Sequence, residues 1–197
     1  MAEAASTDFV LREGSQEDLP RLADIDGSFS NEWVLHIGRA GDAIEQSITL
    51  GWRRLKPAGS TRDIGFDYEE LLRQLTTSYA SSRFVVAETG SRLAGYVMIG
   101  EQWNKTAELM TIIIDASYRR RGLGRRLVAE AEAFARERGL RGLQWEAQTD
   151  NRNAIEFAVS QGFRIAGFHD AFYSNDDLSR QGEADFRGVA LFMARPV

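Results

Sequence analysis

An apolar, β-branched run at residues 109–114 leads into a loop that carries two glycines, and a segment with helical periodicity follows. The loop reads Arg119-Arg120-Arg121-Gly122-Leu123-Gly124. The first turn of a helix has backbone N–H groups without partners and carries the positive end of the helix dipole, so it attracts anions. A glycine has no Cβ, which lets an anion come close to the backbone. Strand, glycine loop and helix in this order therefore predict a phosphate-binding site.

The spacing of the loop excludes two common phosphate-binding motifs. It contains no Gly-Lys-Ser/Thr, so it is not a P-loop, and the third position after Gly124 is Leu127, so it is not a dinucleotide fingerprint. An ordinary strand-to-helix turn that uses two glycines is the alternative. Five arginines between Arg119 and Arg126, in a chain of net charge −5, favour the anion site. Positive side chains at the positive end of a helix are unfavourable unless an anion offsets them.

The loop resembles the acyl-CoA-binding motif of the GNAT N-acetyltransferase superfamily, which reads Arg/Gln-x-x-Gly-x-Gly/Ala after a strand. Further along, Asn151-Arg152-Asn153-Ala154 and then Gly162-Phe163 resemble the second motif of that family, Asn-x-x-Ala followed by Gly-Phe. The two motifs have the family's order and separation and cover roughly residues 83–173. The resemblance implies an α/β (α+β) GNAT-type acyl-CoA N-acyltransferase fold for a single domain, 1–197. That fold has a mixed, mostly antiparallel central sheet flanked by helices, with splayed fourth and fifth strands.

The resemblance also implies acetyl-CoA as the acyl-donor cosubstrate, and no metal. The pantetheine arm would enter between the splayed strands and meet the backbone of residues 112–114. The amides of the glycine loop would hold the diphosphate, and two asparagines of the second motif would touch the arm from the far side. A plain helix cap is the alternative reading of these asparagines. The candidate cofactor-binding residues are Ile112, Ile113, Ile114, Arg119, Arg120, Arg121, Gly122, Leu123, Gly124, Arg125, Asn151 and Asn153.

An amine acceptor arrives protonated, because its pKa is about 10.4, and it must lose a proton before it attacks a thioester. Glu108, at the start of the strand expected to hold the acyl group, is the first candidate base, and Glu146 on the neighbouring strand is the second. Either could instead be a solvated strand residue. Many family members have a tyrosine as the acid four residues before the glycine of Gly-Phe; here that position is Ala158, and Tyr173 is the candidate substitute. A backbone N–H near residues 113–114 would stabilise the oxyanion.

Within the family, Trp103-Asn104 and Glu146-Ala147-Gln148 resemble segments of the streptothricin acetyltransferases. Those enzymes tend to have acids near the centre of the fourth strand, where this chain has Met110 and Thr111, so a different acceptor pocket is expected. The resemblance implies transfer of the acetyl group to a primary amine of a small molecule, such as a streptothricin-like antibiotic, by direct attack in a ternary complex. The alternatives are a protein N-terminal or lysine acetyltransferase and a catalytically degenerate acyl-CoA-binding module.

The composition limits the partners and the compartment. No apolar run approaches the roughly 20 residues that span a bilayer, and the start of the chain lacks the basic flank and apolar core of a signal peptide. The chain has no cysteine, which fits a cytoplasmic protein, and its two histidines, His36 and His169, lack metal-ligand spacing. The net charge of −5 does not favour nucleic acid. A homodimer is common in the family, but no pattern in the sequence demonstrates one.

Hydrophobic periodicity predicts the elements around the glycine loop. A strand at 107–115 has its even-numbered residues, from Glu108 to Ile114, on one face, and a helix at 121–138 ends at Gly139.

Elsewhere, residues 27–65 show no persistent period, and we expect a loop there with at most one strand, which would contribute to the acceptor site. The other expected elements are strands at 9–12, 84–88, 92–100, 142–148, 163–168 and 189–194, and helices at 15–25, 67–81 and 151–161.

Overall fold

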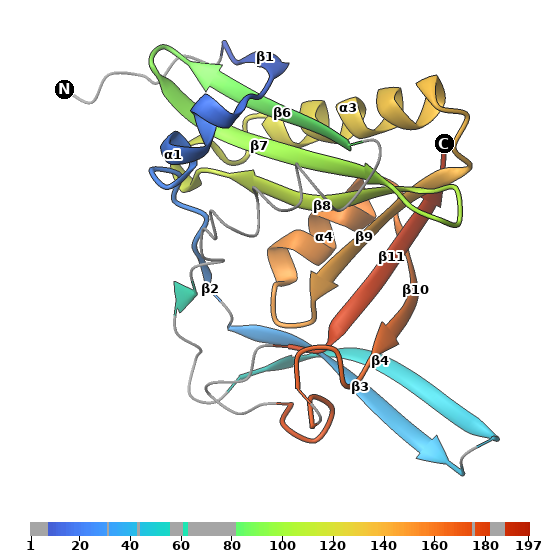
Figure 1. Ribbon diagram of the computed structural model, residues 1–197. Helices are drawn as coiled ribbons and strands as arrows, with labels where there is room; N and C mark the ends of the chain where they lie inside the picture. The colour runs from blue at the N-terminus through green and yellow to red at the C-terminus, as the bar shows by residue number, and fades with distance from the viewer. Residues whose placement is uncertain are drawn as a thin grey trace. The chain divides into compact units, whose positions relative to one another are not determined.

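The computed structural model describes residues 8–30, 32–42, 44–55, 61–62, 82–174, 176–181 and 188–197. The helix expected at 67–81 lies outside these residues. The strands are β1 (Val10–Glu13), β2 (Phe29–Ser30), β3 (Trp33–Gly41), β4 (Gln46–Arg54), β5 (Thr61–Arg62), β6 (Ser82–Thr89), β7 (Arg92–Glu101), β8 (Ala107–Ile114), β9 (Gly142–Gln148), β10 (Arg164–His169) and β11 (Ala190–Pro196) (Figure 1). The helices are η1 (Gln16–Asp18), α1 (Leu19–Leu22), η3 (Ala116–Tyr118), α3 (Leu123–Glu137) and α4 (Arg152–Ser160).

The chain forms two compact units. The first contains Met1–Ser28, Asp63–Trp145 and Arg195–Val197, and the second contains Phe29–Arg62 and Glu146–Ala194. Within the described part of the chain, no helix is long and apolar enough to cross a membrane.

The main sheet has the strand order β1-β6-β7-β8-β9-β11-β10. The pairs β1–β6, β6–β7, β7–β8 and β10–β11 are antiparallel, whereas β8 and β9 run parallel. The expectation of a mixed, mostly antiparallel sheet is therefore confirmed. The parallel pairing covers only the first residues of β8 and ends at Leu109↔Trp145. This is the point where the fourth and fifth strands of the expected fold begin to diverge.

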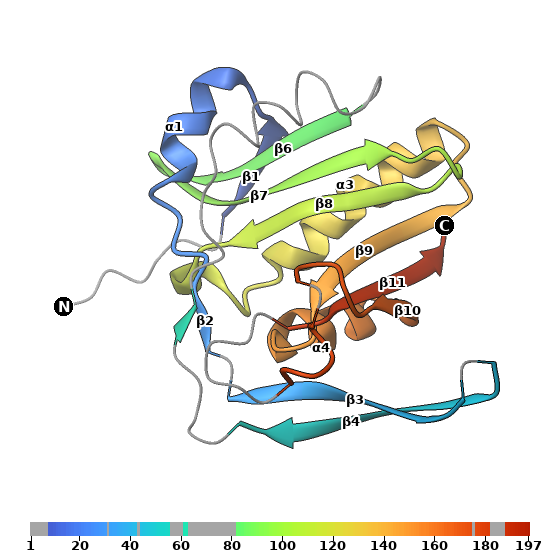
Figure 2. The same cartoon turned by 60° about the horizontal axis from the view of Figure 1, so that its bottom comes forward.

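The first unit has a continuous apolar core on one face of β6, β7 and β8. Leu19 and Leu22 of α1 pack there against residues of the three strands, which are Phe84, Val86, Leu93, Tyr96, Met98 and Ile113. The buried stripe of α3 follows the period of 3.6 residues, and Figure 2 shows α3 behind β8. Gly139 ends this helix as predicted, because it adopts a φ of 62° while Leu140 N–H donates to the Ala135 carbonyl at 2.8 Å.

A β-bulge in β8 changes which residues share a face. Met98 of β7 pairs with Thr111 and Ile99 pairs with Leu109, so Met110 is an extra residue without a partner on β7. The alternation of side chains shifts at this point. Glu108, opposite Gly100, therefore shares its face with Thr111 and Ile113.

The expectation that Glu108 and Met110 share a face with Ile112 and Ile114 is thus wrong. The packing agrees with the shifted register, because Met110 contacts the same apolar core as Ile113. Periodicity alone cannot show a bulge, which is a property of the pairing between two strands.

The second unit contains a long hairpin where the sequence predicted mainly a loop. β3 and β4 pair without interruption from Trp33↔Arg54 to Gly41↔Gln46. Val34 and Ile37 anchor β3 in a second apolar core with Leu55 and Val189. Glycines within and beside these strands hide the period that would have revealed them, because a glycine adds no side chain to the alternating pattern.

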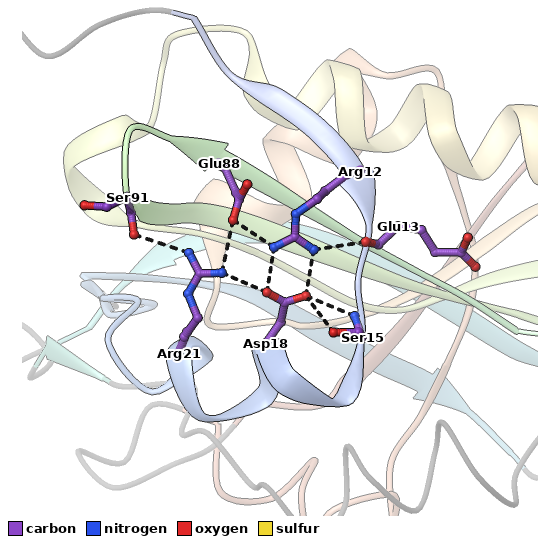
Figure 3. A network of polar contacts seen from close by, with 7 residues as sticks. All are labelled: Arg12, Glu13, Ser15, Asp18, Arg21, Glu88 and Ser91. Atoms are coloured by element: carbon purple, nitrogen blue, oxygen red, sulfur yellow. Dashed lines mark hydrogen bonds and ion pairs between the residues drawn. The ribbon is translucent and has the colours of Figure 1, made fainter.

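A buried carboxylate ties η1 to β1 and β6 in the first unit (Figure 3). Asp18 is 3% exposed and accepts hydrogen bonds from both terminal nitrogens of Arg12, at 2.7 and 2.6 Å, and from Arg21 Nη1 at 2.9 Å. Ser15 N–H donates to the same carboxylate at 3.0 Å. Glu88 of β6 accepts from both arginines, at 2.8 and 3.0 Å. These charged hydrogen bonds hold the pKa of Asp18 far below its usual range, with Arg12 as the main cause.

Candidate active site

The glycine loop follows β8 as a tight, well-defined turn. Asp115 caps η3 by accepting a hydrogen bond from Ser117 N–H at 2.9 Å. Two residues then adopt left-handed backbone conformations, Arg120 with φ of 64° and Gly122 with φ of 82°. Gly122 is also the N-cap of α3. A side chain at Gly122 would meet open space but would be strained by this φ, so the backbone favours glycine here.

The start of α3 offers several backbone donors. Among the described residues, no protein acceptor meets the N–H of Gly122, Leu123, Gly124 or Arg125, and the first helical bond is Arg126 N–H to the Gly122 carbonyl at 3.3 Å. These free donors lie at the positive end of the dipole of a 15-residue helix. Such an arrangement is suited to hold a diphosphate.

The side chain of Arg119 holds the loop in place, a role that the sequence does not indicate. Its guanidinium donates to three backbone carbonyls, those of Ile114 at 2.9 Å, Ser28 at 2.6 Å and Asp26 at 3.1 Å. The side chain is therefore a brace between the loop and residues 26–28, and only its backbone N–H remains a candidate for the anion.

Asp115 makes the second half of the same brace. Its carboxylate accepts from Asp26 N–H at 3.0 Å, and the Asp26 carbonyl accepts from Ala116 N–H at 3.0 Å. The Asp-x-Ser pattern at Asp115 and Ser117 is a known capping signal that could have predicted the local turn, although not the contact with Asp26.

The other loop arginines are exposed. Arg120, Arg121 and Arg125 lie at the surface around the start of α3, and Arg121 lies over the ring of Tyr118 at 5.7 Å. Arg126 donates to the Phe9 carbonyl at 2.8 Å. The exposed arginines give the loop a positive surface, which favours a polyanionic ligand.

The backbone of β8 beyond the bulge pairs with β7 along one edge. Ile112, Ile113 and Ile114 lie opposite Val97, Tyr96 and Gly95 in this pairing. The registered pairing of β8 with β9 has already ended at Leu109. The three isoleucines are therefore in the part of β8 that the expected fold uses to bind an extended ligand arm.

Glu108 lies at the other end of β8, six residues before Ile114, which corresponds to about 20 Å along a strand. Its half-buried carboxylate accepts a hydrogen bond from Gln102 Nε2. Gln144, its neighbour on β9, accepts from Thr106 Oγ1 at 3.0 Å. Gln102 could not be singled out from the sequence, since a polar residue after a strand is an ordinary turn signal.

Glu146 and Tyr173 come together within the second unit. The Tyr173 hydroxyl donates a hydrogen bond to Glu146 Oε1. Burial raises the pKa of Tyr173 far above its usual range, and the negative charge of Glu146 raises it further. A phenol with a raised pKa holds its proton at neutral pH, so this geometry favours Tyr173 as a partner that orients Glu146.

The asparagines of the second motif occupy the start of α4. Asn151 is the N-cap, and its side-chain oxygen accepts from Ala154 N–H at 3.1 Å, which is the plain capping role considered above. Asn153 is exposed on the first turn. Ala158 is fully buried in the same helix. Glu146, Tyr173 and the two asparagines thus belong to the second unit, whereas Glu108 and the glycine loop belong to the first.

Comparison with known proteins gives one family, two similar proteins that match nearly the whole chain, and a further likeness of fold. The sequence model of the Acetyltransferase (GNAT) family matches residues 50–163. A streptothricin acetyltransferase of Streptomyces lavendulae is 28% identical over 203 residues, which cover 100% of this chain and 99% of that protein. The crystal structure of a nourseothricin acetyltransferase has a TM-score of 0.76 at 28% identity, over 95% of this chain and 98% of that one. A Bacillus anthracis protein solved in complex with acetyl coenzyme A has a TM-score of 0.73 at 23% identity, over 96% and 100% of the two chains, and shows likeness of fold.

Proposed function

The chain belongs to the GNAT family of acetyltransferases and is an acetyl-CoA-dependent N-acetyltransferase, and from this premise we propose that its acceptor is a primary amine of a cationic small molecule, such as a streptothricin-like antibiotic. The similarity to a streptothricin acetyltransferase along the whole chain supports this choice of acceptor. The net charge of −5 favours the approach of a cation.

The free amides at the start of α3 are the observation that supports binding of acetyl-CoA by this chain. The residues present fit the diphosphate of acetyl-CoA, because the N–H groups of Gly122, Leu123 and Gly124 have no described protein acceptor. Gly122 keeps the approach open, and exposed Arg120 adds positive charge. The Arg119 brace keeps this loop in one geometry, so less ordering is required when the anion binds.

The edge of β8 is suited to the reacting end of the same molecule. Bound acetyl-CoA supplies an acetyl thioester, whose thiol has a pKa of roughly 8.5 and leaves readily near neutral pH. A backbone N–H between the bulge at Met110 and Ile114 would donate to the developing oxyanion. In this proposal the acyl group lies near the end of the parallel pairing at Leu109, and the diphosphate lies beyond Ile114.

Glu108 is the proposed base. It lies two residues before the bulge on the strand that leads into the cofactor loop, and its hydrogen bond with Gln102 fixes the carboxylate. The carboxylate would take one proton from the acceptor ammonium, and the amine nitrogen would then form a bond to the thioester carbonyl carbon. The carbon–sulfur bond would break, and the leaving thiolate would take the second proton that the nitrogen gives up, which releases the free thiol. Glu146, oriented by Tyr173, is the second candidate base, and its negative charge would also bind an ammonium group.

Three tryptophans, Trp33, Trp103 and Trp145, could offer a ring face to a cationic acceptor, and of these only Trp103 is exposed. Trp103 has 91% of its surface exposed, whereas Trp145 is buried. The face of Trp33 is covered, because the guanidinium of Arg152 lies over its ring at 5.1 Å and at the same distance from Trp52. A cation–π contact with the acceptor would therefore use Trp103.

A thiol-release assay with acetyl-CoA tests the acceptor class. The amines would include streptothricin, a linear polyamine, a neutral monoamine, and peptides with free N-termini or lysines. The proposal expects saturable thiol release with the multiply charged small amines. Thiol release with the peptides alone would refute the small-molecule acceptor and identify the chain as a protein acetyltransferase. Tight binding of acetyl-CoA without release for any amine would identify a binding module.

A further inference from the structure

Asp177 is a buried carboxylate in a turn of the second unit. Its residue has 3% of the surface exposed, although it lies in neither a helix nor a strand. The carboxylate accepts a hydrogen bond from the Tyr173 backbone N–H at 3.0 Å and another from the Ser174 hydroxyl. Burying a carboxylate costs more free energy than burying a neutral side chain, so this placement indicates a specific role.

The residue that Asp177 holds by its backbone is the one whose side chain reaches Glu146. The Tyr173 N–H donates to Asp177, and the Tyr173 hydroxyl donates to Glu146 Oε1. The ring is also held from the side, because the ring of Phe172 packs edge-on against it with the centroids 5.2 Å apart. A tyrosine side chain has only two torsions, so a fixed backbone and a fixed ring set the direction of the hydroxyl.

The same turn is fastened to β3 through the side-chain amide of Gln181. Gln181 Oε1 accepts from the Ile37 N–H at 2.8 Å, and Gln181 Nε2 donates to the Ile37 carbonyl at 3.1 Å. This exchange of two hydrogen bonds with one residue imitates the pairing of a neighbouring strand. Gln181 Nε2 also donates to the Leu178 carbonyl at 2.9 Å, within the turn. The turn is therefore held to two strands, to β9 through Tyr173 and to β3 through Gln181.

We propose that Asp177 is a positioning residue for the acceptor, which holds Tyr173 so that its hydroxyl keeps the Glu146 carboxylate in the orientation that binds the acceptor ammonium. This inference rests on the role proposed above for Glu146. Asp177 acts on Glu146 only through Tyr173. When Asp177 is removed, the Tyr173 N–H loses its acceptor and the hydroxyl takes up several directions. The Glu146 carboxylate must then be ordered when the amine binds, which weakens binding.

Steady-state kinetics with streptothricin and acetyl-CoA test the inference. Asp177→Ala should raise the KM for streptothricin about fivefold and leave the KM for acetyl-CoA unchanged, since ordering one side chain is typically worth a factor of this size. Asp177→Asn keeps an acceptor for the Tyr173 N–H, so it should give a smaller rise, and it replaces Asp177→Ala if that variant does not fold. The matched control is Asp176→Ala, which removes the exposed neighbouring carboxylate and should change neither constant.

A double variant shows whether Asp177 acts through the Tyr173 hydroxyl. The hydroxyl is absent from Tyr173→Phe, so the addition of Asp177→Ala should raise the KM for streptothricin no further. A full additional rise would overturn the inference, because a residue that only supports the fold acts independently of the hydroxyl. An unchanged KM in Asp177→Ala alone would overturn it as well. In either case, a rise in KM with Glu146→Gln would leave the proposed role of Glu146 standing, which separates the two failures.

Fluorine NMR measures the same contact without an acceptor. In protein labelled with 3-fluorotyrosine, the Tyr173 signal is the one that Tyr173→Phe removes. Glu146→Gln should shift this signal, because the hydroxyl then faces a neutral amide in place of a carboxylate. The same replacement should shift the signal much less in the Asp177→Ala background. An equal shift in both backgrounds would mean that Tyr173 reaches Glu146 without Asp177, and it would overturn the inference whichever amine the protein acetylates.

Discussion

Replacing Asp18 by asparagine removes the negative charge from the network of Figure 3 while the shape of the side chain is kept. Arg12 and Arg21 would then share Glu88 alone, with which they make contacts of 2.8 and 3.0 Å. Breaking a buried ion pair from one side typically costs about 3–5 kcal/mol. Both arginines are more than a third exposed, at 35% and 38%, and water replaces part of what they lose. We therefore expect Asp18→Asn to lower the free energy of unfolding by about 3 kcal/mol at pH 7.

The loss should depend on pH with a definite sign. The pKa of Asp18 is lowered in the folded protein, so its charge stabilises the fold above the unfolded pKa of about 3.9. That contribution disappears as the pH falls from about 4 toward the lower pKa of the folded state. The difference in stability between the natural chain and Asp18→Asn should therefore shrink in acid.

Urea denaturation at neutral pH and at several acidic values measures this difference. Glu13→Gln is the matched control, because it removes a negative charge from the same segment while the Glu13 carboxylate points away from the network (Figure 3). Only the backbone carbonyl of Glu13 accepts from Arg12, at 3.0 Å. If the two variants were equally stable at pH 7, or if the deficit of Asp18→Asn persisted unchanged in acid, the reasoning would be refuted.

Three further substitutions address the proposed chemistry. Gly122→Ala should weaken acetyl-CoA binding about tenfold in calorimetry, because it strains a left-handed residue beside the free amides. The control Gly139→Ala strains a left-handed residue at the other end of α3 and should lower only the stability of the protein. Equal affinity of the two variants would remove the loop as the diphosphate site. Glu108→Gln should flatten the rise of kcat/KM with pH, and an unchanged profile would transfer the role of base to Glu146. Tyr173→Phe should reduce kcat by less than about tenfold, since a catalytic acid is typically worth about 10²–10⁴; a loss in that larger range would restore Tyr173 as the acid.

The parts of the fold with strong local signals could be predicted from the sequence. The apolar stripe and terminal Gly139 locate α3, and the apolar run before the glycine loop locates β8. The β3–β4 hairpin could not be predicted, because its pairing joins residues such as Val34 and Arg53 across a glycine-rich stretch without a clear period. Strand pairing is a nonlocal property, and local propensity carries little information about it.

In the candidate site, too, only the locally encoded features could be predicted from the sequence. The motif locates the residues of the glycine loop, but it does not indicate that the Arg119 side chain donates to three backbone carbonyls. The capping role of Asn151 could be predicted from the sequence, because an asparagine directly before a helix is a common N-cap. The contact between Tyr173 and Glu146 joins residues 27 apart, and no sequence pattern indicates it.

β8 has one residue more than the stretch of β7 with which it pairs. The extra residue at Met110 shifts the alternation of side chains for all residues of β8 that precede it. Exchanging Met110 for another amino acid leaves that count intact, so a scan of replacements would pass over the feature. Removing the codon for Met110 would restore an unbroken ladder and leave Glu108 opposite Gly100, on the same face of the sheet as Thr111 and Ile113. A shortened chain would therefore test the bulge itself, which a replacement of the Met110 side chain leaves in place.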